Sequence, residues 1–274
     1  MARTSDRPRH EQPHRGRPRH EHGRARRELS QNFISPGAAE RLVRTAAPRT
    51  DLPVLEVGAG RGAVTAALVP HCRDVTAYEV DARHAAVLRA RFAGDARVRV
   101  VAGDFLAARA PHEPFAVVGN VPFARTSEIV EWCLAAPALT EATLLTQWEY
   151  ARKRTGGYGR WTLRVVRTWP SHEWRAHGRF ARTEFRPVPR VDAGVLRLTR
   201  RAVPLLDGAR LRGYEALVDT GFAGRGGSLY TSLRAHAGAR RLAAAFREAR
   251  VPLDAPVGYV APAQWLVLAD ELAH

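Results

Sequence analysis

The chain of 274 residues is poor in cysteine, with only Cys72 and Cys133. Two cysteines in a chain of this length do not make a disulfide framework, so we expect a protein of the reducing cytoplasm. Neither cysteine belongs to a group of cysteine and histidine residues of the kind that binds zinc. The sequence therefore predicts no metal site.

Long apolar segments are also missing. No run approaches the roughly 20 residues that a membrane-spanning helix needs. The basic N-terminus is not followed by the apolar stretch that a secretory signal contains. We therefore expect a soluble chain that does not contact a membrane.

Lysine is nearly absent, because Lys153 is the only one among 43 lysine and arginine residues. A coding bias toward GC-rich codons explains arginine in place of lysine, but it does not explain the excess over 27 aspartate and glutamate residues. The net charge of +16 indicates a polyanionic partner, with nucleic acid as the first candidate. Arginine suits such a partner because its planar fork pairs with phosphates and stacks on bases.

Residues 1–28 are rich in arginine, histidine, proline and glycine and have almost no apolar side chains. They bury too little surface to offset the entropy of ordering, so we predict a disordered basic tail. Two interpretations stay open: non-specific contacts with RNA phosphates, and a solvated tail without an essential role. The first predicted helix begins at Ser35 and Pro36, a capping hydroxyl followed by a proline, and ends before Pro48.

Strands and helices alternate between residues 52 and 146, a pattern typical of a parallel sheet with its ligand at the carboxyl ends of the strands. The predicted strands cover residues 52–57, 75–78, 98–101, 115–119 and 142–146. A turn containing Gly58, Gly60 and Gly62 follows the first strand, where glycine lets the backbone approach a ligand closely.

Polar residues stand where three of these strands end, namely Glu79, Asp104 and Asn120. Glu79 lies about twenty residues past the glycine turn, a position suited to accept hydrogen bonds from a ribose. Each carboxylate has a structural alternative, because strand-end carboxylates often cap loops. The three polar residues and the glycine turn together nevertheless predict a ligand site along this edge of the sheet.

The residues Asn120, Val121, Pro122 and Phe123 form a second motif at the end of a buried strand. The amide offers an oxygen acceptor, the proline restricts the backbone, and the aromatic ring offers a flat face. These are the groups needed to hold a planar base by its amino group.

The second half of the chain changes character after Gln147. We predict helices over residues 148–154 and 161–169, strands over 173–177 and 193–198, and a wholly helical segment from 205 to the end. The two prolines of residues 185–192 predict a rigid extended segment, either one wall of a cleft or a connector. Six arginines of the helical segment are candidates for RNA contact, with a solvated helix face as the alternative: Arg225, Arg234, Arg240, Arg241, Arg247 and Arg250.

The ordered set of motifs resembles the ribosomal RNA adenine N6-methyltransferases, which include the small-subunit dimethyladenosine transferases and the erythromycin-resistance (Erm) enzymes. The motifs are Gln31-Asn32-Phe33, residues 56–62, Glu79, Gly103-Asp104, residues 120–123 and residues 185–192. Within the family the chain is more similar to the arginine-rich Erm branch, since the small-subunit branch more often has Asn-Leu-Pro-Tyr and a lysine-bearing Pro-Pro-Pro-Lys segment.

The resemblance implies an α/β fold, with a Rossmann-like class I methyltransferase domain over residues 29–203. It implies a seven-stranded, mostly parallel sheet there and a small all-helical RNA-binding domain over residues 204–274. The implied cofactor is S-adenosyl-L-methionine. The implied substrate is an adenine of 23S rRNA at the macrolide-binding site, modified before ribosome assembly is complete by a monomeric enzyme, with antibiotic resistance as the consequence.

The resemblance also assigns roles to residues. Asn32 and Ile34 flank the cofactor, Gly58 and Gly60 admit its methionine part, Glu79 holds the ribose, Asp104 holds the adenine amino group, and Asn120 lies near the reactive methyl. Phe123 stacks on the target adenine, while Asn120 and a carbonyl near Val121 or Pro122 accept its amino hydrogens. Val121 favours RNA, because a DNA adenine methyltransferase would carry Asn-Pro-Pro-Phe or Asn-Pro-Pro-Tyr there. A small-subunit enzyme and a non-catalytic nucleic-acid-binding protein on the same fold remain alternatives.

Overall fold

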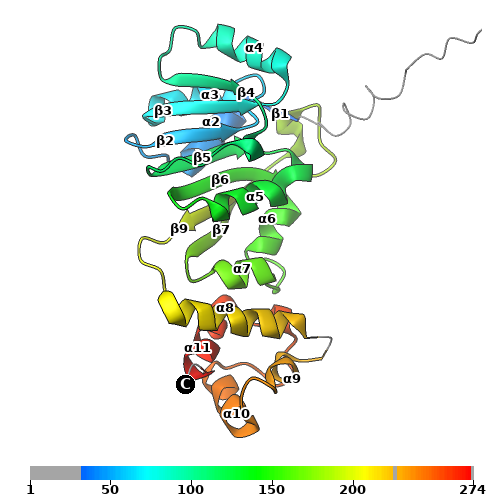
Figure 1. Ribbon diagram of the computed structural model, residues 1–274. Helices are drawn as coiled ribbons and strands as arrows, with labels where there is room; N and C mark the ends of the chain where they lie inside the picture. Colours follow the sequence, from blue (N-terminus) through cyan, green and yellow to red (C-terminus); the bar gives the residue numbers. More distant parts are fainter. Residues whose placement is uncertain (1–31, 225–226, 273–274) are drawn as a thin grey trace, which may run out of the picture. The chain divides into compact units, whose positions relative to one another are not determined.

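A seven-stranded sheet forms the centre of the computed structural model, which describes residues 32–224 and 227–272 (Figure 1). The strand order is β4-β3-β2-β5-β6-β9-β7. The strands are β2 (Pro53–Val57), β3 (Asp74–Glu79), β4 (Val98–Ala102), β5 (Phe115–Asn120), β6 (Leu139–Gln147), β7 (His172–Phe180) and β9 (Ala193–Arg200). The first five in the spatial order are parallel, and β9 runs antiparallel to both of its neighbours. The predicted mostly parallel sheet of seven strands is confirmed.

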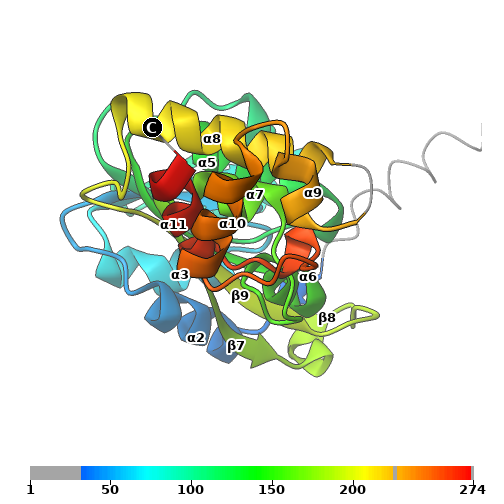
Figure 2. The same ribbon diagram turned by 90° about the horizontal axis from the view of Figure 1, so that it is seen from below.

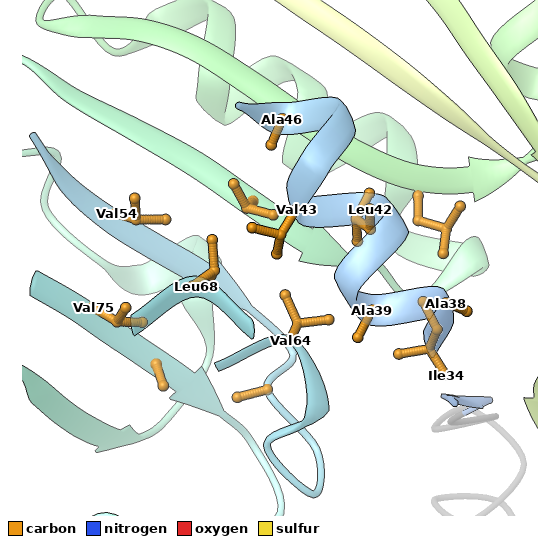
Figure 3. Close-up of a cluster of buried hydrophobic side chains, with 14 of the residues drawn as sticks. Ile34, Ala38, Ala39, Leu42, Val43, Ala46, Val54, Val64, Leu68 and Val75 are labelled. Carbon is orange, nitrogen blue, oxygen red and sulfur yellow. The ribbon is translucent and has the colours of Figure 1, made fainter. Parts of the chain in front are cut away.

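Two helical layers cover the sheet because alternate strand residues point to opposite faces. In β5, Ala116 and Val118 face a core shared with α2 and α3, whereas Phe115 and Val117 face a core shared with α5. Figure 3 shows the first core, in which side chains of α2 and α3 meet those of the strands. The helices of this part are α2 (Pro36–Ala46), α3 (Ala63–Leu68), α4 (Ala82–Arg91), α5 (Thr126–Ala135), α6 (Trp148–Arg154) and α7 (Leu163–Thr168).

The start of α2 follows its predicted capping signal. The Ser35 hydroxyl accepts the N–H of Ala38 at 3.3 Å, and Pro36 stands in the first turn. The helix ends at Ala46, one residue before the left-handed Ala47. Capping of this kind stabilises a helix by about 1 kcal/mol, and it sets where the chain turns from β1 (Phe33–Ile34) into α2.

After residue 207 the structure describes four α-helices, shown together in Figure 2, and their side chains form a core of their own. They are α8 (Gly208–Ala223), α9 (Leu229–Leu233), α10 (Ala239–Glu248) and α11 (Pro262–Leu272). The Tyr214 hydroxyl of α8 donates to the Val166 carbonyl of α7 at 2.7 Å, and Val166 also belongs to this core. The division at residues 203 and 204 stays a prediction.

Some predicted bounds were wrong. The helix expected over residues 161–169 is the shorter α7, because the backbone at Thr162 is extended, with φ of −105° and ψ of 151°, and the helix begins only after it. The expected extended segment 185–192 begins as a short strand, β8 (Phe185–Arg186), which pairs with β1. The predicted disordered tail of residues 1–28 lies outside the described residues, as does Arg225. Within the described segments, no helix has the length and apolar character needed to cross a membrane.

Candidate active site

The strand order brings the predicted polar residues to one edge of the sheet. Glu79 and Asn120 are the last residues of β3 and β5, the two strands that flank β2. Asp104 follows β4, two residues beyond its end. The carboxyl ends of neighbouring parallel strands lie side by side, so Glu79 and Asn120 lie on either side of the turn that leaves β2, and Asp104 lies one strand further out.

The glycine turn needs its glycines for conformation and for space. Gly58, Gly60 and Gly62 have φ of +68°, +57° and +81°, in the left-handed region that side chains other than glycine rarely adopt. A Cβ on Gly60 would lie 3.0 Å from the Phe33 ring, and one on Gly58 would lie 3.6 Å from the Asn120 carbonyl. The turn thus presents bare backbone to the space beside Asn120.

Glu79 links this turn to the end of β3. Its carboxylate is buried and accepts the backbone N–H groups of Gly60 at 2.7 Å and Asp81 at 2.8 Å. Hydrogen bonds to a carboxylate are stronger than those between neutral groups. Glu79 therefore fixes the turn as well as marking the site predicted for a ribose.

A second buried carboxylate, Glu56, lies one residue before the end of β2 and was not predicted as part of the site. The Thr65 hydroxyl donates to it at 2.6 Å. Burial raises the pKa of Glu56 to about 7, and the charge of Glu79 acts in the same direction. The sequence signal that could have identified Glu56 is its position as a carboxylate inside the apolar run of residues 52–57.

Asn120 is oriented by the segment before α2. Its side-chain nitrogen donates to the backbone carbonyl of Asn32 at 2.6 Å. A backbone carbonyl can only accept, so the amide orientation is unambiguous. Its side-chain oxygen accepts no hydrogen bond from any of the residues the structure describes.

Val121, Pro122 and Phe123, the other residues of this motif, are partly buried or already hydrogen-bonded within the fold. Val121 is buried, and its N–H donates to the Leu145 carbonyl at 3.2 Å. Phe123 begins a 3-10 turn, Phe123–Arg125, and is half-buried. The Pro122 carbonyl already accepts the N–H of Arg125 at 2.9 Å. Of the two carbonyls considered for the target base, that of Val121 is therefore the better candidate.

Asp104 has the loop-capping role that was the alternative for strand-end carboxylates. It accepts the N–H of Leu106 at 3.0 Å and lies 3.5 Å from the guanidinium of Arg125. Arg125 belongs to no recognisable motif, so the sequence did not predict it as a site residue. Val80, the residue after Glu79, was not predicted either. Its apolar side chain is 52% exposed and is a suitable face for a planar ring.

A cavity of about 590 Å³ opens beside the glycine turn. Four of the predicted cofactor residues border it: Ile34, Gly58, Gly60 and Asn120. The other predicted residues do not line it: Asn32, Glu79, Asp104, Val121, Pro122 and Phe123. Phe33 also lines the cavity at the turn, with its ring close to Gly60 and the Arg61 guanidinium 4.7 Å from its centroid.

The cavity wall also contains Thr183, Glu184 and Arg186, which were not predicted as site residues. Thr183 and Glu184 come from the turn between β7 and β8, outside the segment 185–192 that had been considered as a wall, and Arg186 lies within that segment, in β8. Across the described ranges 32–224 and 227–272, no group of three histidine, cysteine, aspartate or glutamate side chains is arranged to hold a metal ion.

Comparisons with known proteins agree on one family. The family model described as ribosomal RNA adenine dimethylase matches residues 22–274. The rRNA adenine N-6-methyltransferase of Streptomyces fradiae is 56% identical over 248 residues, which cover 89% of this chain and 78% of that protein. The mycinamicin-resistance protein MyrB of Micromonospora griseorubida is 38% identical, covering 85% of this chain and 76% of MyrB.

A solved structure matches as well. The crystal structure of the 23S rRNA methyltransferase ErmE superposes with a TM-score of 0.86 at 47% sequence identity. The match covers 89% of this chain and all of that chain.

Proposed function

Because the chain belongs to the ribosomal RNA adenine dimethylase family, we propose that it methylates the N6 amino group of an adenine in 23S rRNA. The proposed target is the macrolide-binding site, and the consequence is resistance to macrolide-type antibiotics. The observation that carries the chemistry is the Asn120 side chain, whose nitrogen is held by Asn32 and whose oxygen is left as an acceptor. The 23S target is supported by the likeness to ErmE, and resistance by the likeness to MyrB.

The strand tips fit S-adenosyl-L-methionine as the cofactor. The glycine turn would admit its methionine part beside Asn32 and Ile34, since Gly58 and Gly60 leave bare backbone there. Glu79 would accept the ribose hydroxyls, Asp104 would meet the adenine amino group, and the exposed Val80 would cover the adenine ring. When bound, the cofactor supplies a methyl group that is already activated on a sulfonium.

The target adenine would be held by the motif that follows β5. A base must leave its stack to be modified, which costs a few kcal/mol. Phe123 would stack on the extruded base and recover about 1–3 kcal/mol. The Asn120 side-chain oxygen and the Val121 carbonyl would accept the two amino hydrogens. Accepting them out of the ring plane favours a localised lone pair on the amino nitrogen.

Positioning is then the main catalytic contribution of the protein. The sulfonium is a strong electrophile because it leaves as a neutral thioether. The amino nitrogen becomes positively charged when it takes the methyl group, and it then releases one proton to water, so the reaction needs no strong general base. None is present at Asn120, Val121, Pro122 or Phe123. The net charge of +16 supports binding to RNA through its phosphates.

Incubation with radiolabelled S-adenosyl-L-methionine and separate samples of 23S rRNA, 16S rRNA and duplex DNA tests the proposal. We expect label on 23S rRNA alone, at one adenine located by primer extension. Label on 16S rRNA would instead support a small-subunit enzyme, label on DNA would support a DNA methyltransferase, and RNA binding without label would support a non-catalytic binder.

We propose further that the enzyme acts as a cytoplasmic monomer on 23S rRNA before ribosome assembly is complete. Base extrusion needs an accessible strand, which free rRNA offers more readily than an assembled subunit. Equal rates on protein-free 23S rRNA and on the complete large subunit would contradict this timing. Sedimentation of the active protein would test the monomer.

A further inference from the structure

The orientation of the Asn120 amide depends on a single backbone group. Its nitrogen lies 2.6 Å from the carbonyl oxygen of Asn32. A half-turn of the amide would place the side-chain oxygen against that carbonyl, so that two acceptors would face each other without a proton between them. Asn32 therefore selects the orientation in which the oxygen of Asn120 faces the proposed substrate.

Asn32 is held in turn by a very short piece of sheet. It directly precedes β1, which contains only Phe33 and Ile34 and pairs with β8. In the register, Phe33 lies opposite Arg186 and Ile34 opposite Phe185. A ladder of two residue pairs is marginal by itself, so the position of Asn32 needs further support.

Glu184, the residue before β8, supplies that support through both its backbone carbonyl and its side chain. Its backbone carbonyl accepts the N–H of Ser35 at 3.0 Å, immediately after β1. One side-chain oxygen accepts the guanidinium of Arg41 on α2 at 2.6 Å, and the other accepts the N–H of Ala181 at 2.8 Å. The Arg41 guanidinium lies 3.9 Å from the centroid of the buried Phe180 ring at the end of β7.

We propose that Glu184 is a positioning residue for methyl transfer, an inference that rests on the function proposed above. Its carboxylate joins Arg41 of α2 to Ala181, the residue after β7, and so fixes the loop whose backbone carbonyl at Glu184 holds Ser35 after β1. This contact keeps Asn32 in place, and Asn32 keeps the oxygen of Asn120 turned toward the amino group of the target base. Glu184 acts through β1 and Asn32, so its effect falls on the rate of transfer at saturation.

The test compares single-turnover methylation at saturating S-adenosyl-L-methionine and 23S rRNA. We expect Glu184→Ala, which removes the hydrogen bonds to Arg41 and Ala181, to lower the rate about tenfold through a less firmly held Asn32. Glu184→Gln still accepts the N–H of Ala181 and should restore the rate to within about threefold of wild type. Glu173→Ala is the matched control, because Glu173 forms a similar 2.6 Å ion pair with Arg175 that does not contact β1, and its rate should stay unchanged.

A double-mutant cycle separates positioning from a general loss of structure. In an Asn120→Ala background there is no amide to orient, so Glu184→Ala should lower the residual rate by less than about twofold. Asn120→Ser, which also lacks an amide, provides a faster background. The same tenfold loss in these backgrounds would overturn the proposal.

Measuring the affinity for the cofactor tests the alternative that Glu184 contacts the cofactor directly. Glu184 borders the cavity, so a contact would appear in calorimetry as weaker cofactor binding with an unchanged saturated rate, a result that also overturns the proposal. If Glu184→Ala does not fold, Arg41→Gln breaks the same ion pair from α2 while the bond to Ala181 remains, and it should lower the rate about threefold. An unchanged rate in Arg41→Gln would overturn the proposal. A wild-type protein that leaves rRNA unlabelled would refute the proposed function instead, before any variant is compared.

Discussion

Replacing Glu56 by glutamine tests whether burial of this carboxyl group at the end of β2 makes the stability of the protein depend on pH. Glu56 is 1% exposed and hydrogen-bonded to Thr65. Burial raises its pKa from 4.5 to about 7, the nearby charge of Glu79 adds to this, and the Thr65 hydroxyl opposes it. The folded protein therefore binds a proton at Glu56 more tightly than the unfolded chain does.

The sign and size of the effect follow from linkage. Glu56 contributes its full stabilisation below pH 4.5, and this contribution is lost as the pH rises through 7. At about 1.4 kcal/mol for each pH unit between the two values, the loss is about 3 kcal/mol. Glutamine has no charged form, so Glu56→Gln removes this dependence on pH.

The wild-type profile alone does not isolate Glu56, because His172 acts in the opposite direction. Burial and the charge of Arg200 lower the pKa of His172 from 6.5 to about 4. Its contribution is present above pH 6.5 and is lost as the pH falls toward 4. The informative quantity is the difference in unfolding free energy between wild type and Glu56→Gln.

Urea unfolding at several pH values from 4.5 to 8 gives this difference. We expect the stability of wild type relative to Glu56→Gln to fall by about 3 kcal/mol across the range. The exposed Glu248 provides the control Glu248→Gln, whose profile should run parallel to that of wild type. Parallel profiles for wild type and Glu56→Gln would refute the assigned pKa and the role of burial.

The remaining predictions concern the proposed site. Asn120→Ala should nearly abolish methyl transfer while rRNA affinity in filter binding stays within about twofold, because the change removes an acceptor and no phosphate contact; wild-type turnover would contradict the assignment. Glu79→Ala should weaken cofactor binding in calorimetry by about 10- to 100-fold, the value of one or two hydrogen bonds to a carboxylate; unchanged affinity would remove Glu79 from the ribose site. Phe123→Ala should lower kcat/KM for rRNA about 10- to 100-fold through lost stacking, while Phe123→Tyr keeps the ring and should stay near wild type; equal losses in both variants would exclude stacking.

Local patterns were enough to predict the elements that carry the site. The predicted strands 52–57 and 115–119 end at or one residue before the observed ends of β2 and β5, which are Val57 and Asn120. Strand alternation also predicted that Glu79, Asp104 and Asn120 share one edge of the sheet. Parallel strands impose this arrangement once their order along the chain is known.

Contacts between distant parts of the chain were not predictable in the same way. The pairing of β1 with β8 joins residues 33–34 to 185–186, and no local pattern marks either segment as a partner of the other. The ion pair of Asp104 with Arg125 gave a strand-end carboxylate a structural role that its position alone left open. Glu56 reads as one polar residue in an apolar run, and only its burial raises its pKa.

The sequence by itself determined the type of fold, the edge of the sheet at which the proposed site lies and the residue types available there. These properties depend on side-chain periodicity, capping and glycine turns, all of which act over a few neighbouring residues. The tertiary structure alone decided which atoms of those residues face the proposed substrate. The Asn120 amide is the clearest case, because its orientation is set by a carbonyl 88 positions away in the chain.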